Sequence, residues 1–82
     1  MNTDKLVRMA NQIGAFFATE PDHAVAVESV TSHIRRMWEP RMRAGLLAHV
    51  AETGGAGLSP LVLEAVTANR ERLASLTPRN PT

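Results

Sequence analysis

Helix signals are the feature of this sequence that most restricts its fold. Apolar residues recur every three or four positions in four separate stretches, and prolines and glycines mark where those stretches start or stop. No segment of useful length alternates apolar with polar residues, as the strand of a half-exposed sheet does. The sequence therefore predicts an all-α fold of about four short helices joined by tight connections.

Two long helices are expected first. One covers about residues 4–18 with Thr3 as its N-cap, and the next covers about residues 21–38 with Pro21 at its first position. Each carries an apolar stripe that we expect to face the core. The stripes are Leu6, Met9, Ala10, Ile13, Phe16 and Phe17 on the first helix, and Val27, Val30, Ile34, Met37 and Trp38 on the second. Gly14, in the middle of the first helix, either lets another backbone approach closely or is simply tolerated there.

Two shorter helices are expected to follow. The third covers about residues 40–52, begins with a proline and is stopped by Gly54. The fourth begins after its N-cap, Ser59, and runs to about Leu76. Asn69 lies within the apolar stripe of this fourth helix, so its amide needs either an internal hydrogen bond or a contact in an interface.

Length and composition allow a single small domain. We place that domain at residues 1–76 of the 82 and expect a disordered tail at residues 77–82. Aromatic residues make up only 4% of the chain, so the core is expected to be mainly aliphatic. A core of this size supplies stability on the order of a few kcal/mol. A partner, identical or different, is therefore an expected source of further stability.

Charge and hydropathy exclude several kinds of function. Nine Lys and Arg residues against eight Asp and Glu residues give a net charge of +1, which argues against a general binder of nucleic acid. The longest apolar stretches are far shorter than the roughly 20 residues of a membrane-spanning helix, and the N-terminal residues lack the pattern of a signal peptide. We therefore expect a cytoplasmic domain with no membrane partner.

No set of residues predicts catalysis or metal binding by this chain. His23, His33 and His49 have spacings that match no metal-ligand pattern, and the acidic residues are scattered singly. The chain has no cysteine, which excludes a disulfide, a thiolate metal site and a cysteine nucleophile. The glycine-rich residues 54–57 follow no predicted strand, which favours a flexible corner over a phosphate loop. We expect no catalytic residue and no cofactor bound by this chain.

Residues 33–43 are the segment best suited to contact a partner. They include four arginines, one acid, the only tryptophan and two of the four methionines. Trp and Arg are enriched at the centres of protein interfaces. The alternative is a solvated basic edge with Trp38 closing the core. Arg43 projects from the apolar face of its helix, so it must either extend to solvent or meet a carboxylate or carbonyl group.

Several strings of residues, taken together and in order, are specific. They are Lys5–Ile13 (KLVRMANQI), Phe16–Phe17, His33, Trp38–Arg43 (WEPRMR) and Gly57–Val62 (GLSPLV). These strings resemble the small delta subunit of NAD-dependent formate dehydrogenases. The resemblance covers about residues 1–68, and Met37 stands where that family usually has phenylalanine.

The resemblance implies a place in a larger redox enzyme. In that family, a large alpha subunit holds a bis-molybdopterin guanine dinucleotide molybdenum centre and iron–sulfur clusters, while beta and gamma subunits carry FMN, further clusters and the NAD site. The cytoplasmic complex oxidises formate to carbon dioxide and passes the electrons to NAD. The resemblance implies that this chain is a non-catalytic accessory subunit, which binds none of these cofactors and supports assembly or stability of the complex.

The resemblance also suggests which residues dock on the alpha subunit or support the fold. The stronger candidates are Trp38, Pro40, Arg41, Met42 and Arg43, and the weaker ones are Asn11 and Gln12. Two other functions stay open. The chain could be a small helical nucleic-acid-binding module, because its arginines are clustered on short helices. A protein that neutralises phosphates normally uses more cations than the four arginines of this segment. In isolation, a second copy of the chain can also occupy the surface meant for the partner.

Overall fold

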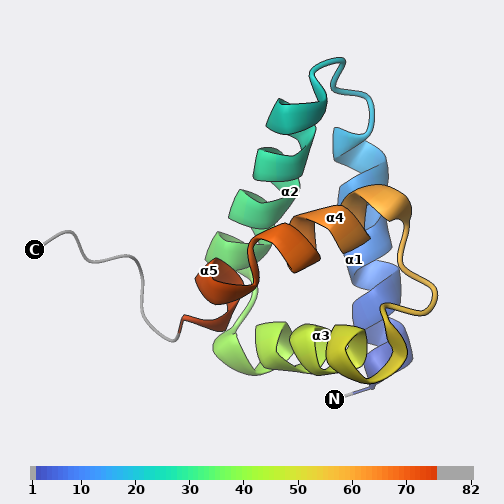
Figure 1. The fold of residues 1–82 in the computed structure, drawn as a ribbon, viewed down its shortest axis with the longest axis vertical. Helices are drawn as coiled ribbons and strands as arrows, with labels where there is room; N and C mark the ends of the chain where they lie inside the picture. Colours follow the sequence, from blue (N-terminus) through green and yellow to red (C-terminus); the bar gives the residue numbers. More distant parts are fainter. Residues whose placement is uncertain (1, 76–82) are drawn as a thin grey trace, which may run out of the picture.

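The computed structural model describes residues 2–75, which form five helices. In chain order they are α1 (Thr3–Phe17), α2 (His23–Met37), α3 (Pro40–Thr53), α4 (Pro60–Ala68) and α5 (Arg70–Ala74) (Figure 1). These described residues contain no strand, so the predicted all-α fold is confirmed. Each of the five helices falls short of the length and apolar character that crossing a bilayer requires.

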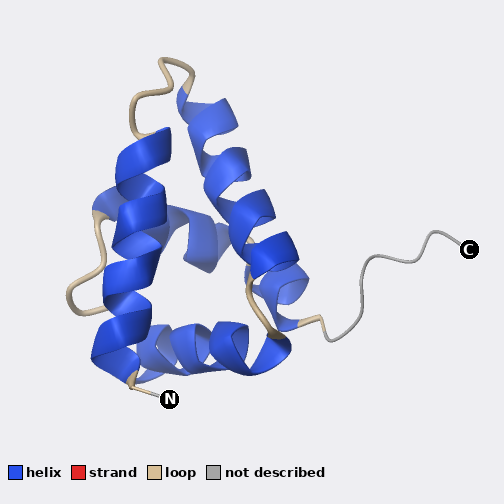
Figure 2. Cartoon of the chain, turned by 180° about the vertical axis from the view of Figure 1, so that it is seen from behind, coloured by secondary structure: helices blue, strands red, loops and turns tan. Residues whose placement is uncertain are grey.

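Helices α1 and α2 form an antiparallel pair on which the other helices are arranged. Figure 2 shows α1 and α2 side by side at the front, with α3 crossing the end where α1 begins and α2 ends. Helix α4 lies behind the pair and packs against both of its helices, while α5 packs against α3 and α2. Among the described residues, α4 therefore covers one face of the pair, and no helix covers the opposite face.

The core between these helices is mainly aliphatic, as expected. Its side chains come from all five helices, and the residue that follows α2 adds an aromatic ring. Trp38 is only 6% exposed, so its ring closes the core at the end of α2. The buried cluster consists of Leu6, Ala10, Val30, Ile34, Trp38, Leu46, Val62, Ala65, Val66 and Leu73.

Two residues expected in the inward-facing stripes are exposed instead. Phe16 is 71% exposed and Met37 is 67% exposed. Helix α1 buries a line of residues centred on Ala10, and Phe16 lies about 120° around the helix from that residue. At the end of α2, Trp38 fills the core and Met37, the last helical residue, stays outside. The apolar stripes are therefore wider than the faces that the fold buries.

Two helix starts differ from the prediction. Asn2, not Thr3, caps α1, because the Asn2 side chain accepts hydrogen bonds from two backbone amides of the first turn. Helix α2 begins at His23 instead of Pro21, because the Asp22 carboxylate accepts hydrogen bonds from two backbone amides and acts as the N-cap. The two later helices begin at the expected prolines.

The fourth expected helix is interrupted at Asn69. The side-chain amide of Asn69 donates to the Ala65 carbonyl and to the Thr31 hydroxyl, both at 3.0 Å. The backbone of Asn69 leaves the helical region (φ −122°, ψ 32°), which separates α4 from α5. Of the two readings of this residue, the internal hydrogen bond is the one found. The expected helix end near residue 76 and the expected tail at residues 77–82 lie outside the described residues.

Candidate docking site

Two hollows flank α1, one on each side. The first lies between α1, α4 and the start of α2, and we call it the α1–α4 hollow. The second lies between α1 and the end of α2, and we call it the α1–α2 groove. Their volumes are about 420 and 410 Å³. Both fall in the range of sites that hold a bound group.

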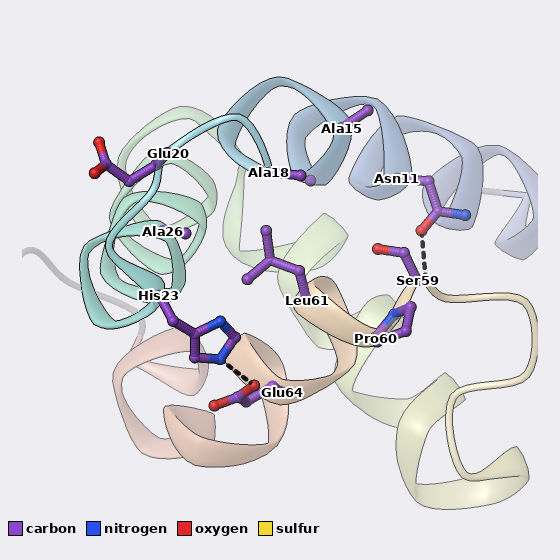
Figure 3. A pocket seen from close by; sticks show the side chains of 11 residues that line it. Asn11, Ala15, Ala18, Glu20, His23, Ala26, Ser59, Pro60, Leu61 and Glu64 are labelled. Atoms are coloured by element: carbon purple, nitrogen blue, oxygen red, sulfur yellow. Dashed lines mark hydrogen bonds and ion pairs between the residues drawn. The ribbon is translucent and has the colours of Figure 1, made fainter.

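The α1–α4 hollow has a floor of small side chains (Figure 3). Ala15, Ala18 and Ala26 line it, and Leu61 points into it from α4. Gly14 allows this arrangement, because a Cβ at that position would lie 2.5 Å from Cγ2 of Val62. Of the two readings of Gly14, close approach of another helix is therefore the one found.

The polar side chains around the α1–α4 hollow are engaged with one another or with the backbone. Nδ2 of Asn11 donates to the Gly57 carbonyl, and Oδ1 of Asn11 accepts the Ser59 amide, both at 2.9 Å. At the mouth, Nε2 of His23 donates to Oε1 of Glu64 at 2.7 Å (Figure 3). Asn11 thus fastens the loop before α4 to α1, which is a role in the fold.

The α1–α2 groove is lined mainly by large apolar and aromatic side chains. The Phe16 and Phe17 rings meet edge to face at 5.0 Å, and Phe17 meets the His33 ring at 6.0 Å. Trp38 and Gln12 also line the groove. Phe16 therefore has one aromatic contact, with Phe17, while most of its side chain stays exposed. The full lining is Met9, Gln12, Ile13, Phe16, Phe17, His33 and Trp38.

The rim of the α1–α2 groove is basic. Lys5 is exposed and continues the stripe of Met9 and Phe16 toward the start of α1. On the α2 side, Arg36 is exposed and lines a neighbouring hollow together with Phe17 and Glu28, an acid that is itself paired with Arg72. No acidic side chain of the described residues lines the groove itself.

Several residues of the Trp38–Arg43 string (WEPRMR) form or pack the fold. Pro40 is the first residue of α3, and Met42 packs against the core. Arg43 is 2% exposed, whereas Arg41, two residues earlier, is exposed. Only part of the string therefore lies at the surface, and it does not form one continuous patch with Trp38.

Arg43 joins α3 to the end of α5. Its Nη1 donates to the carbonyls of Leu73, at 3.1 Å, and Ser75, at 2.8 Å. Burial lowers the pKa of the Arg43 guanidinium, and the nearby positive charge of Arg35 lowers it further. The buried Nε of Arg43 has no hydrogen-bond partner among the described residues. Of the alternatives open for Arg43, extension to solvent or contact with a carboxylate or carbonyl, the contact with carbonyl groups is therefore the one found.

A bidentate ion pair links α2 to α5. Nη1 and Nη2 of Arg72 donate to the two carboxylate oxygens of Glu28 at 2.8 and 2.9 Å. The hydrogen bond from Arg72 lowers the pKa of Glu28, and the same bond raises the pKa of Arg72. Within residues 2–75, no three His, Asp or Glu side chains are grouped so that they could hold a metal ion.

The structure brings together only two of the predicted docking residues, Gln12 and Trp38, which share the α1–α2 groove. Asn11 faces the opposite hollow. The exposed apolar residues Phe16 and Met37 were missed as surface candidates because their stripes were expected to face the core. Apolar stripes of this width are usual on helices that face a core, so the sequence gives no signal that these two residues are exposed.

No curated protein and no solved structure matches this chain. Residues 5–66 match the family model described as "NADH-dependant formate dehydrogenase delta subunit FdsD". The matched region covers nearly all of α1 to α4, and it contains the lining of both hollows. The chain therefore belongs to the family of formate dehydrogenase delta subunits.

Proposed function

We propose that this chain is a non-catalytic accessory subunit of a cytoplasmic, NAD-dependent formate dehydrogenase complex, where it docks on the large alpha subunit and supports assembly or stability. The family match over residues 5–66 is the observation that carries this proposal. A delta subunit is by its description one chain of a larger enzyme. The apolar surface left exposed at Phe16 and Met37 is consistent with a chain that meets a partner.

The surroundings of the histidines support a non-catalytic role. His23 pairs with Glu64, and His33 contacts the ring of Phe17. Nε2 of His49 donates to the carbonyl of Ala56 at 2.7 Å. The three histidines therefore lie in different parts of the fold and do not together form one site.

The cofactors of the complex are proposed to stay on its other subunits. The chain has no cysteine and therefore offers no thiolate for an iron–sulfur cluster. Both hollows are dominated by apolar side chains, which suit an apolar partner group better than a charged pterin or nucleotide. The molybdenum centre, the iron–sulfur clusters, FMN and NAD would then all reside outside this chain.

The nucleic-acid alternative has less support in the folded chain than in the sequence. Of the four arginines in residues 33–43, Arg43 is buried and Arg35 bonds to the Ser75 hydroxyl at 3.4 Å. Arg36 and Arg41 are the exposed members of this cluster. Two exposed cations are few for a site that must neutralise several phosphates.

The proposal is tested by producing the formate dehydrogenase complex with and without this chain. We expect an affinity tag on this chain to recover the alpha subunit. Without the chain, we expect a lower yield or lower thermal stability of the complex, with unchanged NADH production per molybdenum centre. A tagged chain that elutes free of every other subunit would refute docking. Loss of turnover in a complex that is otherwise fully assembled and fully loaded would refute the non-catalytic role.

A further inference from the structure

We propose that the α1–α2 groove binds an amphipathic helix of a different protein, whose large apolar side chains enter the groove and whose carboxylates meet its basic rim. This inference rests on the proposed function, because it assigns the docking face of a subunit that is argued to have a partner. It adds the place of contact and the chemistry of the partner segment.

Two large apolar side chains at this face of the molecule are exposed, and no described helix covers them. Phe16, which lines the groove, is 71% exposed, and Met37, which lies beside the groove next to its lining residue Trp38, is 67% exposed. The Phe16 ring makes an edge-to-face contact with Phe17. An aromatic side chain has only two rotatable bonds and so loses little conformational freedom on binding, and methionine adapts to irregular surfaces. Both residues are therefore suited to be anchors of an interface.

The shape of the groove favours a helix as its occupant. Its walls are two antiparallel helices, and its lining runs along more than two turns of α1, from Met9 to Phe17. Among the described residues, no helix lies on this face of the pair (Figure 2). A helix that presents apolar residues at positions i, i+3, i+4 and i+7 fits such a groove, as in known helix-in-groove complexes.

Charge determines which kind of helix fits. Lys5 and Arg36 are exposed beside the groove, and Arg41 is exposed at the start of α3. None of these three cations makes an ion pair with the described residues. Of the nearby acids, Glu28 is engaged with Arg72, and Glu39 lies between the two arginines in sequence. Carboxylates on the partner would complement the positive charge that remains.

The same charges argue against a second copy of this chain as the occupant. In a twofold homodimer built on the groove, each basic rim would face the other copy's basic rim. Like charges brought together at an interface raise the free energy of binding. A different protein with acidic residues around an apolar stripe avoids that cost.

Photo-cross-linking in the assembled complex tests the location. Phe16 is replaced by p-benzoylphenylalanine in a chain expressed with the other subunits, and Thr67, exposed on α4, is replaced in the same way as a control. We expect position 16 to cross-link to one helical segment of another subunit, rich in Leu, Phe, Asp and Glu, and position 67 not to cross-link there. Cross-links from position 67 alone, or from position 16 to a second copy of this chain, would overturn the inference.

Surface variants test the chemistry of the same face. We expect Phe16→Ser combined with Met37→Ser to weaken capture of the complex by the tagged chain at least about tenfold, while Val25→Ser, an exposed apolar control outside the groove, leaves capture unchanged. Arg36→Glu should weaken capture, unlike Arg70→Glu on α5. Circular dichroism of each variant checks that the fold is intact.

The outcomes separate this inference from the proposed function. If the unaltered chain captures the complex but the groove variants capture it equally well, docking occurs elsewhere and only this inference fails. If the unaltered chain captures no other subunit, the proposed function fails and the inference fails with it.

Discussion

Arg41 and Arg43 lie two residues apart in the same string of the sequence but have different surroundings. Arg43 is buried and donates to the carbonyls of Leu73 and Ser75, so it fastens α5 to α3. Arg41 is exposed and available to a partner. Replacing Arg43 or Trp38 therefore tests the fold, whereas replacing Arg41 or Gln12 tests docking. The docking roles predicted for these residues stay predictions.

Replacing Arg43 with alanine is expected to destabilise the chain by about 2–3 kcal/mol, because two carbonyls near the core lose their donor and the buried stem is removed. Arg41→Ala changes an exposed side chain and should alter stability by less than about 0.5 kcal/mol. Urea unfolding of the two variants at neutral pH measures both changes. Equal unfolding midpoints for the two variants would show that Arg43 does not hold α5 in place.

The Glu28–Arg72 ion pair predicts a pH dependence of stability. Because the pKa of Glu28 is lower in the folded chain, the pair stabilises the fold above the ordinary Glu pKa of 4.5, and this is lost as the pH falls through the lowered pKa. Both side chains are about half exposed, so the pair contributes at most about 1 kcal/mol. Glu28→Gln should destabilise the chain by up to that amount at pH 7.

The pH dependence is checked by unfolding the Glu28→Gln variant and the unaltered chain between pH 7 and about pH 2.5. The difference between them should shrink toward zero at the acidic end. Glu71→Gln, which changes an exposed acid with no ion pair among the described residues, is the control and should show no such trend. A Glu28→Gln difference that stays constant over this range would contradict the assignment.

At the scale of the helices, the crossing of α1 and α4 depends on Gly14. A Cβ there would lie 2.5 Å from Val62, whose branched side chain is fully buried and has little room to move. We therefore expect Gly14→Ala to destabilise the chain by about 1–2 kcal/mol, although alanine favours a helix more than glycine does.

A second substitution distinguishes this clash from a general loss of packing. Val62→Ala alone should destabilise the chain by leaving a cavity. Combined with Gly14→Ala, it should cost less than the sum of the two single changes, because the new methyl group occupies space that the valine has left. Unfolding free energies of the three variants give the coupling. Strict additivity would mean that the two residues are not in the close contact described.

Most helix boundaries could be predicted because their signals are local. Pro40 and Pro60 begin helices, and Gly54, with φ of +75°, ends α3. The interruption at Asn69 could not be predicted, because one of its two acceptors is Thr31, on α2. A residue whose conformation depends on a distant partner gives no reliable local signal.

At the scale of the whole molecule, the all-α class follows from the sequence, whereas the α1–α2 groove does not. Phe16 and Met37 belong to regular apolar stripes, and only the arrangement of five helices shows that no described helix covers them. Family membership came from specific strings of residues, two of which the structure now explains through the bonds of Asn11 and Arg43.

The proposed function requires this chain to bind other subunits of a formate dehydrogenase complex. Native mass spectrometry of the complex, purified through a tag on this chain, tests it most directly. We expect one major species that contains the alpha subunit and a fixed number of copies of the 8.9 kDa chain. A spectrum that contains only the free chain or its homo-oligomers would contradict it.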